Sequence, residues 1–247
     1  MSKPTEPEGK SEKKKLHIAQ RDKIPYDFTL REFPWTEKQK EVISAIGSKE
    51  SRITMLKGVA GTAKTLLAVY SALDSLSKKK IGEIFYIRNP VESSSFSLGY
   101  LKGDLDEKLD PYIQPLKDKM DELVAPSMIT KMVEEKRIIG TPLGFLRGRS
   151  FNACHVIVDE AQNLTVSDLL LVMTRMGKFA KLTICGDATQ SDIKHSGFEE
   201  VYDLFNDSEA ELRGIKNFEF GKEDIFRSEI LSFVIERFEE KKKAESS

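Results

Sequence analysis

A short stretch in the first quarter of the chain has the residue types of a phosphate-binding loop. The sequence GVAGTAKT, residues 58–65, follows a short apolar run and precedes apolar residues at helical spacing. Here Gly58 and Gly61 allow the backbone to approach an anion, and the N–H groups and dipole of the following helix attract it. We expect Lys64 to reach the β- and γ-phosphates of a nucleotide and the Thr65 hydroxyl to be a ligand of Mg²⁺. A glycine-rich turn that binds nothing is the alternative.

Ala63 departs from the strict pattern of such loops, G-x-x-x-x-G-K-[ST], which has glycine immediately before the lysine. A methyl group at this position disfavours a positive φ by roughly 1–2 kcal/mol. We therefore expect a negative φ at Ala63 and an intact loop. The residues expected to bind the nucleotide in and beside the loop are Gly58, Val59, Ala60, Gly61, Thr62, Ala63, Lys64, Thr65 and Leu66.

Two carboxylates close a second apolar run, VIVDEAQN, residues 156–163. In open α/β sheets, ligands bind in the crevice outside the carboxyl ends of the strands, where these acids would lie. We expect Asp159 to hold Mg²⁺ through water and Glu160 to activate the attacking water as the general base. The alternative is a buried strand that merely ends in polar residues.

A third apolar run ends in CGDATQSD, residues 185–192. Gly186, Asp187 and Gln190 should then lie beside the acids that close the previous strand. The Gln190 amide can donate and accept hydrogen bonds, so it suits contact with a γ-phosphate or with the attacking water. An ordinary turn built from glycine, aspartate and serine is the alternative.

The elements that must position these residues alternate along the chain. Apolar runs separated by helical patterns indicate a parallel sheet covered on both faces, which is a three-layer α/β fold. Thr165 and Asp168 form a plausible capping box at the start of one helix. The predicted strands cover 53–56, 83–87, 154–158 and 182–185, and the predicted helices cover 66–76, 169–176 and 229–239.

A helical stripe interrupts this alternation at residues 104–124. Asp110 followed by Pro111 is typical of an N-cap and a first-turn proline, so we expect two helices here rather than one. The stripe is either core packing or a subunit contact, and the sequence does not choose between them. This segment is the predicted helical insertion beside the sheet.

Composition limits the classes of protein to which the chain can belong. The 247 residues carry a net charge of −1, so no global basic field indicates nucleic acid. No apolar run approaches the ~20 residues needed to span a bilayer, and the first residues lack the hydrophobic region of a secretion signal, so we expect a cytoplasmic protein. Cys154 and Cys185 are expected to be buried thiols. We expect one ATPase domain at 31–240, with polar tails at 1–30 and 241–247.

The whole set of motifs resembles the PhoH-like family over about residues 33 to 238. The resemblance is carried, in order, by WTEKQKEVISAI, YIRNPVESSSFSLGYLKGDLDEKLDPYIQPL, TPLGFLRGRSF, VIVDEAQN, MTRMGKFAKLTICGDATQSD and EDIFRSEIL. It implies a RecA-like P-loop ATPase related to the first motor domain of superfamily 1 helicases, with ATP and Mg²⁺ as ligands. Family members usually have glycine where this chain has Ala63.

The resemblance also implies roles outside the three motifs. Gln39 would read the adenine edge, and Arg227 would contact the γ-phosphate and stabilise charge in the transition state. Related helicases close the nucleotide cleft with a second motor domain, and this chain has length for only one. The resemblance therefore implies a homo-oligomer, most simply a hexameric ring, with an arginine supplied in trans. The candidates for that arginine, which we do not rank, are Arg147, Arg149 and Arg175.

A nucleic-acid path must be a local patch on this nearly neutral chain. Arg88 and Asn89 follow the second predicted strand, where related motors contact the strand along which they move. Each candidate also has an ordinary explanation as a surface or interface residue. The residues expected to contact RNA or single-stranded DNA are Arg88, Asn89, Arg147, Arg149, Lys194 and His195.

Three functions remain open at this point. The first is an oligomeric ATPase that acts on RNA or single-stranded DNA as a helicase or translocase. The second is a phosphotransferase for a small molecule, against which the paired acids argue. The third is an ATP-switched scaffold that hydrolyses slowly and binds a protein partner.

Overall fold

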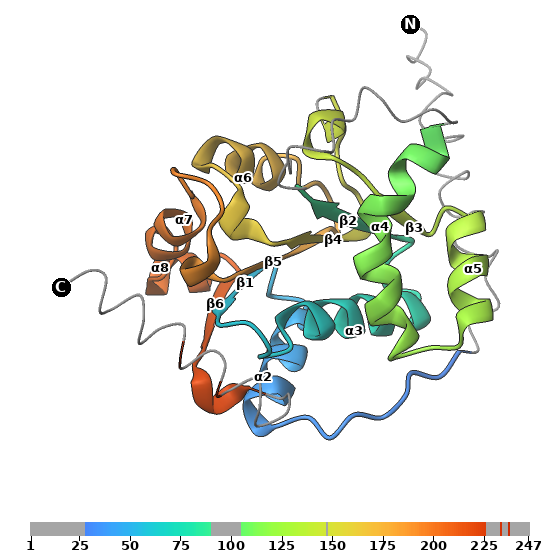
Figure 1. Cartoon of the computed structure of the whole chain (residues 1–247), viewed down its shortest axis with the longest axis horizontal. Helices are drawn as coiled ribbons and strands as arrows, with labels where there is room; N and C mark the ends of the chain where they lie inside the picture. Colours follow the sequence, from blue (N-terminus) through green and yellow to red (C-terminus); the bar gives the residue numbers. More distant parts are fainter. Residues whose placement is uncertain (1–27, 90–104, 147, 226–232, 234–236, 238–247) are drawn as a thin grey trace, which may run out of the picture.

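A parallel sheet forms the centre of the computed structural model, which describes residues 28–89, 105–146, 148–225, 233 and 237. The described residues form six strands in the order β3-β2-β4-β5-β1-β6, and all neighbouring strands are parallel (Figure 1). The strands are β1 (Ile53–Gly58), β2 (Glu83–Arg88), β3 (Ile138–Gly140), β4 (Cys154–Asp159), β5 (Lys181–Gly186) and β6 (Ile215–Phe220).

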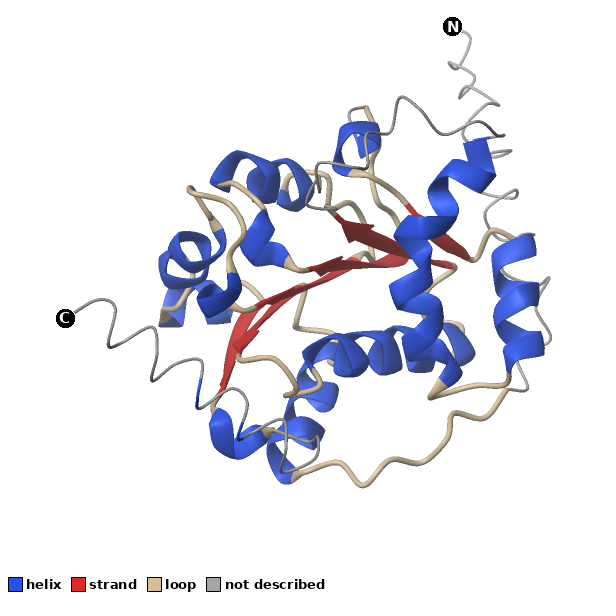
Figure 2. Ribbon diagram, viewed as in Figure 1, coloured by secondary structure: helices blue, strands red, loops and turns tan. Residues whose placement is uncertain are grey.

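Helices cover both faces of the sheet (Figure 2). One apolar core lies under α2, α3, α4 and α5, and a second core lies under α6 and α7. This arrangement confirms the predicted three-layer α/β fold with a parallel sheet. The helices are α2 (Glu37–Gly47), α3 (Lys64–Ser77), α4 (Leu105–Asp121), α5 (Pro126–Glu134), α6 (Val166–Met173), α7 (Phe198–Leu204) and α8 (Ser208–Leu212). Short 3₁₀ turns are η2 (Leu143–Leu146), η3 (Ala161–Asn163), η4 (Ala188–Gln190) and η5 (Lys222–Asp224).

The central strand β4 is buried along its whole length. It pairs with β2 in a register that sets Arg88 opposite Asp159, and with β5 in a register that sets Val158 opposite Ile184. β1 pairs with the other side of β5, with Leu56 opposite Cys185. The carboxyl ends of these strands therefore meet at one edge of the sheet, which brings the polar residues that follow them together.

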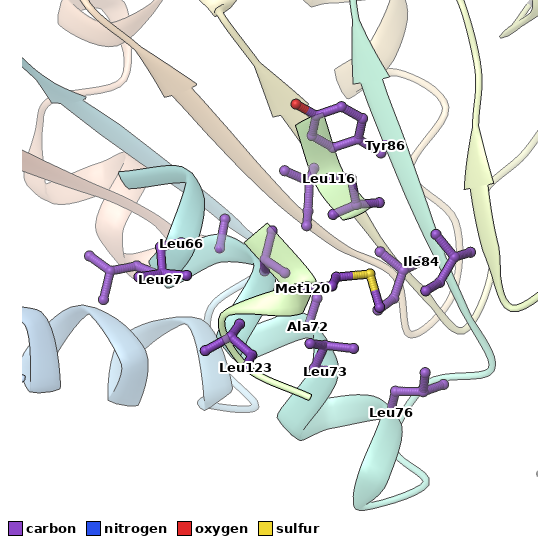
Figure 3. Packing of buried hydrophobic residues seen from close by; sticks show 14 of the residues in the cluster. Leu66, Leu67, Ala72, Leu73, Leu76, Ile84, Tyr86, Leu116, Met120 and Leu123 are labelled. Atoms are coloured by element: carbon purple, nitrogen blue, oxygen red, sulfur yellow. The ribbon is translucent and has the colours of Figure 1, made fainter. Parts of the chain in front are cut away.

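The helical stripe is core packing from residue 113 onward, where the structure describes its side chains. Leu116, Met120 and Leu123 are buried and pack with Leu73 of α3 in the same apolar cluster (Figure 3). The expectation of two helices is wrong, because α4 runs unbroken from Leu105 to Asp121. A proline inside a helix costs about 3 kcal/mol, and the free energy of burying several large apolar side chains at roughly 1.5–3 kcal/mol each exceeds it.

Two strands escaped prediction, and the reasons differ. β3 is only three residues long. β6 lies at the edge of the sheet and mixes polar with apolar residues, so it lacks the continuous apolar pattern of the central strands. The predicted capping box between Thr165 and Asp168 is confirmed, and a second one joins Thr36 to Gln39 at the start of α2.

Other expectations have mixed outcomes. Cys154 and Cys185 are free and buried, as predicted. The terminal tails and the predicted helix at 229–239 lie wholly or mostly outside the described residues, and the single domain at 31–240 stays a prediction. Within the described part of the chain, no helix has both the length and the hydrophobicity needed to span a membrane.

Candidate nucleotide-binding site

The loop between β1 and α3 has the backbone shape of a phosphate cradle. β1 ends at Gly58 and α3 begins at Lys64. A Cβ atom added to Gly58 would lie 2.6 Å from the carbonyl oxygen of Phe220, so a side chain there would collide with the end of β6. Gly61 has a φ of 87°, which glycine adopts without steric cost. Both glycines are therefore required by the local backbone.

Ala63 adopts the left-handed conformation, with φ 64° and ψ 18°, immediately before α3. The expectation of a negative φ at this residue is wrong. The chain must turn from the strand into the helix within a few residues, and the turn places a left-handed residue at the helix N-cap. An alanine in that conformation costs roughly 1–2 kcal/mol, and the rest of the fold supports it.

The Lys64 side chain lies inside the loop. Its Nζ donates hydrogen bonds to the carbonyl oxygens of Gly58 at 2.7 Å and Val59 at 2.9 Å. Burial lowers the pKa of the Lys64 amine, while the neighbouring carboxylates, Asp187 first among them, act in the opposite direction. The amine is thus held by neutral carbonyl acceptors, which a charged phosphate oxygen could replace.

Asp159 is held by two hydroxyl groups at the end of β4. Its Oδ1 accepts a hydrogen bond of 2.8 Å from Oγ1 of Thr65, and its Oδ2 accepts one of 2.5 Å from the phenol of Tyr86. Only 6% of Asp159 is exposed. Burial, and then the nearby Asp159 carboxylate, raise the pKa of Tyr86, so the phenol keeps its proton. The predicted metal-binding pair, Thr65 and Asp159, is therefore brought into direct contact.

Glu160 follows Asp159 in a left-handed conformation, with φ 53°. Its Oε2 accepts a 2.5 Å hydrogen bond from Nε2 of Gln162, and its Oε1 lies 3.5 Å from a guanidinium nitrogen of Arg88. Gln162 in turn accepts a hydrogen bond from the backbone N–H of Asp187. The expected general base is thus fixed by an amide and paired with a cation from β2.

The loops after β4 and β5 are joined by further hydrogen bonds. Asn163 donates to Asp192 through its side chain and accepts from the Asp192 backbone N–H. The Ser191 hydroxyl donates to the Gln162 carbonyl. Together with the contact between Gln162 and Asp187, these bonds tie the two loops to each other at several points.

Asp187 presents an unused carboxylate oxygen. Its Oδ1 accepts hydrogen bonds from the backbone and the hydroxyl of Thr189. Its buried Oδ2 has no hydrogen-bond partner among the described residues. A buried charged oxygen without a partner is costly unless a ligand or water completes it. Gln190, the last residue of η4, is exposed at the same edge of the sheet.

A cavity of about 480 Å³ joins these groups. It contains the expected residues from the loop, from the end of β4 and from the end of β5. It is also lined by side chains that the sequence did not indicate. These come from the end of α4, from the residue that follows α4, and from the loop after β4. The lining residues are Ala60, Gly61, Ala63, Lys64, Thr65, Leu66, Lys119, Glu122, Asp159, Glu160, Gln162, Cys185, Gly186, Asp187 and Gln190.

The donor set of this cavity fits a Mg²⁺ ion that arrives with a nucleotide. Mg²⁺ prefers oxygen ligands and is held by one or two carboxylates, waters and substrate phosphates. Thr65 and Asp159 supply a hydroxyl and a carboxylate side by side, and Asp187 adds an unpaired oxygen in the same cavity. Among the described residues, no group of three or more His, Cys, Asp or Glu side chains could hold a metal ion by itself.

Gln39 lies apart from this cavity, on α2. It is 1% exposed, and its Oε1 accepts a hydrogen bond from the Thr36 backbone N–H. Its buried Nε2 has no partner in the part of the chain that the structure describes. The amide nitrogen therefore keeps both of its N–H donors free, and an N–H donor is what recognition of an adenine ring nitrogen requires.

The residues expected to contact nucleic acid or to act in trans are dispersed. Arg88 is paired with Glu160, and the Arg149 guanidinium lies 4.9 Å from the ring centre of Phe85. Asn89, Lys194 and His195 are exposed and lie outside the cavity lining, and Arg175 is half-buried. Arg147 and Arg227 lie outside the described residues.

Three contacts were missed at the level of the sequence. Tyr86 lies in a strand whose neighbours are apolar, so nothing marked its hydroxyl as part of a site. Gln162 lies inside a quoted motif, and its polar side chain two residues after the expected general base was a usable signal. Lys119 reaches the cavity from α4, a helix whose position beside the loop only the fold reveals.

The family model and the similar proteins that match this chain belong to one family. Residues 33–239 match the family described as PhoH-like protein. The PhoH-like protein of Synechocystis sp. is 34% identical over 207 residues, which cover 83% of this chain and 61% of that protein. The PhoH-like protein of Bacillus subtilis is 33% identical over 204 residues, covering 83% and 63%. Protein PhoH of Escherichia coli is 33% identical over 197 residues, covering 78% and 54%.

The chain thus matches little more than half the length of these relatives. Among solved structures, a match is the crystal structure of Pif1 helicase from Candida albicans, with a TM-score of 0.37 and 15% identity. The match covers 77% of this chain and 40% of the helicase chain.

Proposed function

Because the chain belongs to the PhoH-like protein family, a family of P-loop NTPases, we propose that it binds ATP with Mg²⁺ and hydrolyses it. One observation carries the proposal. The loop residues Lys64 and Thr65 share a cavity with the acids Asp159 and Glu160, and Thr65 touches Asp159 directly. A lysine, a hydroxyl and two carboxylates at the carboxyl edge of a parallel sheet are the parts that phosphoryl transfer to water requires.

The phosphates would be bound by the loop. Its backbone N–H groups and the N-terminus of α3 supply the donors. Lys64 would exchange its two carbonyl acceptors for β- and γ-phosphate oxygens. Thr65 and Asp159 would hold Mg²⁺, Asp159 through water, and a bound Mg²⁺ would neutralise charge on the phosphates. Because the Thr65 hydroxyl donates its hydrogen bond to Asp159, the lone pairs of its oxygen stay free for the metal.

Hydrolysis would depend on Glu160 and Gln190. Glu160 would take a proton from the attacking water, with its carboxylate oriented by Gln162. Gln190 would contact the γ-phosphate or that water from the neighbouring loop. Arg227 would stabilise charge on the transferring phosphoryl group. The free buried amide donor of Gln39 supports recognition of adenine, and so a preference for ATP.

Coupling to RNA or single-stranded DNA and assembly into a hexameric ring belong to the same proposal. Arg88 supports the coupling, because it stands at the end of β2 and also pairs with Glu160. Asn89, Lys194 and His195 are exposed and available for phosphate contacts. Arg147, Arg149 and Arg175 remain the candidates for a group supplied by a neighbouring subunit.

The test is phosphate release with Mg·ATP, with and without a panel of RNAs and single-stranded DNAs. Glu160→Gln should lower kcat about 100-fold, the lower end for loss of a general base, while nucleotide binding persists. Lys64→Ala should abolish both hydrolysis and nucleotide binding. Lys78→Ala is the matched control, because Lys78 is an exposed lysine paired with Asp74 at the far end of α3. Equal rates in all four proteins would refute the proposed activity.

A slow ATP-switched scaffold is the second candidate. The strained backbone of Ala63 and the pairing of Arg88 with Glu160 favour low turnover. The same panel separates the two functions. A rate that nucleic acid raises supports the helicase or translocase, whereas a slow rate that no RNA or DNA changes supports the scaffold.

A further inference from the structure

The carboxylate of Asp159 receives one hydroxyl on each of its oxygens. Thr65, from the start of α3, donates to Oδ1 at 2.8 Å, and Tyr86, from β2, donates to Oδ2 at 2.5 Å. Thr65 belongs to the phosphate-binding loop, and its contact is expected of such a site. Tyr86 belongs to no phosphate-binding motif, and the donation from its phenol needs an explanation of its own.

Tyr86 is fully buried in the core between the sheet and α4. Figure 3 shows its ring at the border of the apolar cluster, beyond Leu116 and Ile84. A phenylalanine would fill that space equally well. A buried hydroxyl without a hydrogen bond costs about 1–3 kcal/mol, so a phenol is tolerated here because Asp159 accepts from it. The phenol also satisfies one oxygen of a buried carboxylate, which would otherwise have no side-chain donor among the described residues.

Two donors from two different elements fix the carboxylate plane. With only the Thr65 contact, the Asp159 side chain could turn about its terminal bond, since carboxylate torsions are broad. With Tyr86 in place, Oδ2 has a set direction, and the remaining lone pairs of both oxygens point to fixed places. Hydrogen-bond partners behind metal-binding groups act in this way in many sites, where they orient a carboxylate and adjust its affinity for the metal.

We propose that Tyr86 is a positioning residue for Mg²⁺, which holds Asp159 in the orientation that binds the metal through water. The proposal rests on the proposed function, because it takes the Mg·nucleotide complex as the ligand. Tyr86 itself touches neither metal nor nucleotide. Its effect should therefore be confined to the metal and should leave the affinity for metal-free nucleotide unchanged.

The test is Tyr86→Phe, which removes one hydroxyl and keeps the ring. Mn²⁺ binding to the ADP complex is measured by electron paramagnetic resonance, and Mg²⁺ by competition. We expect the metal dissociation constant to rise about tenfold or more, the usual cost of losing a partner behind a metal-binding group. The affinity for ADP in EDTA should stay within a factor of two. Tyr70→Phe is the matched control, since Tyr70 packs its ring edge-on against Trp35, on the other side of α3 from Asp159.

A double-mutant cycle with Asp159→Asn separates positioning from general damage. If Tyr86 acts through the Asp159 carboxylate, Tyr86→Phe should cost little further metal affinity in the Asp159→Asn background. Thermal unfolding in EDTA establishes that each variant is folded. Unchanged metal affinity in folded Tyr86→Phe, equal loss of metal and metal-free ADP binding, or additive losses in the cycle would each overturn the proposal alone. Absence of metal-dependent nucleotide binding in the unmodified protein would refute the proposed function as well.

Discussion

The left-handed backbone of Ala63 predicts how substitutions there change the free energy of unfolding. The sign of that change depends on the φ angle of the residue. Replacing Ala63 by glycine removes the Cβ atom that a φ of 64° disfavours. Replacing it by valine adds a branched side chain, which tolerates a positive φ least. Stability should therefore fall in the order glycine, alanine, valine. If φ were negative, glycine would be the least stable of the three.

The magnitudes come from three opposing effects. Release of the left-handed strain contributes roughly 1–2 kcal/mol. Glycine increases the entropy of the unfolded chain, which costs about 0.4–1 kcal/mol. The half-buried methyl packs against the α3-side core, and losing about half of a methylene equivalent costs about 0.4 kcal/mol. We expect Ala63→Gly to raise the free energy of unfolding by about 0.5 kcal/mol. We expect Ala63→Val to lower it by about 1 kcal/mol or more.

Urea unfolding without nucleotide measures these differences, because the midpoint shifts while the slope stays constant. Ala72→Gly, in the middle of α3, is the control for loss of a methyl group where the backbone is helical. It should cost at least about 1 kcal/mol plus the burial of its side chain. Two results would contradict strain at Ala63: a free energy of unfolding that is about 1 kcal/mol lower in Ala63→Gly, or an Ala63→Val protein as stable as the parent.

The remaining predictions concern Gln162 and His155. Gln162→Ala removes the donor that holds Glu160 and the acceptor for the Asp187 N–H. It should lower kcat about tenfold with little change in KM, and it should lower the free energy of unfolding by about 1–3 kcal/mol. Phosphate release measures the first effect and urea unfolding the second, and a kcat equal to the parent's would contradict the role given to Gln162. His155 is fully buried, and burial lowers its pKa from 6.5 to about 3, so the unfolded chain binds a proton that the native state refuses as pH falls from 6.5 towards 3. Stability is therefore lost on acidification, by about 1.4 kcal/mol between pH 7.5 and 5.5 from this residue. His155→Gln should lose that component and exposed His195→Gln should keep it, when urea midpoints are compared at the two pH values; identical pH dependence in both would rule out His155 as the cause.

The chemistry-bearing residues were predictable because their types and their positions at strand ends are local features. A glycine-rich turn before Lys64 and two acids after an apolar run needed only the rule that parallel strands end at one edge. The backbone of Ala63 was not predictable in this way. Its dihedral angles follow from joining β1 to α3 across a short loop, and the intrinsic preference of alanine is outweighed.

The misses in the fold have the same origin. Pro111 predicts a break from local preference, and the packing of Leu116 and Met120 on α3 overrides it. β6 lacks a local signature because it lies at the edge of the sheet. Tyr86 lies in the apolar run 83–87 that was predicted as a strand, and its ring is buried in the core. Only the three-dimensional arrangement reveals that its hydroxyl meets a carboxylate far away in the sequence.

The hydrogen bonds between the loops after β4 and β5 have a mechanical consequence. Asn163 and Asp192 hold each other reciprocally, and Gln162 is bound at both its side chain and its carbonyl. These hydrogen bonds resist movement of one loop relative to the other. A displacement of the exposed segment that carries Lys194 would therefore act through these bonds on Gln162, whose amide holds the carboxylate of Glu160.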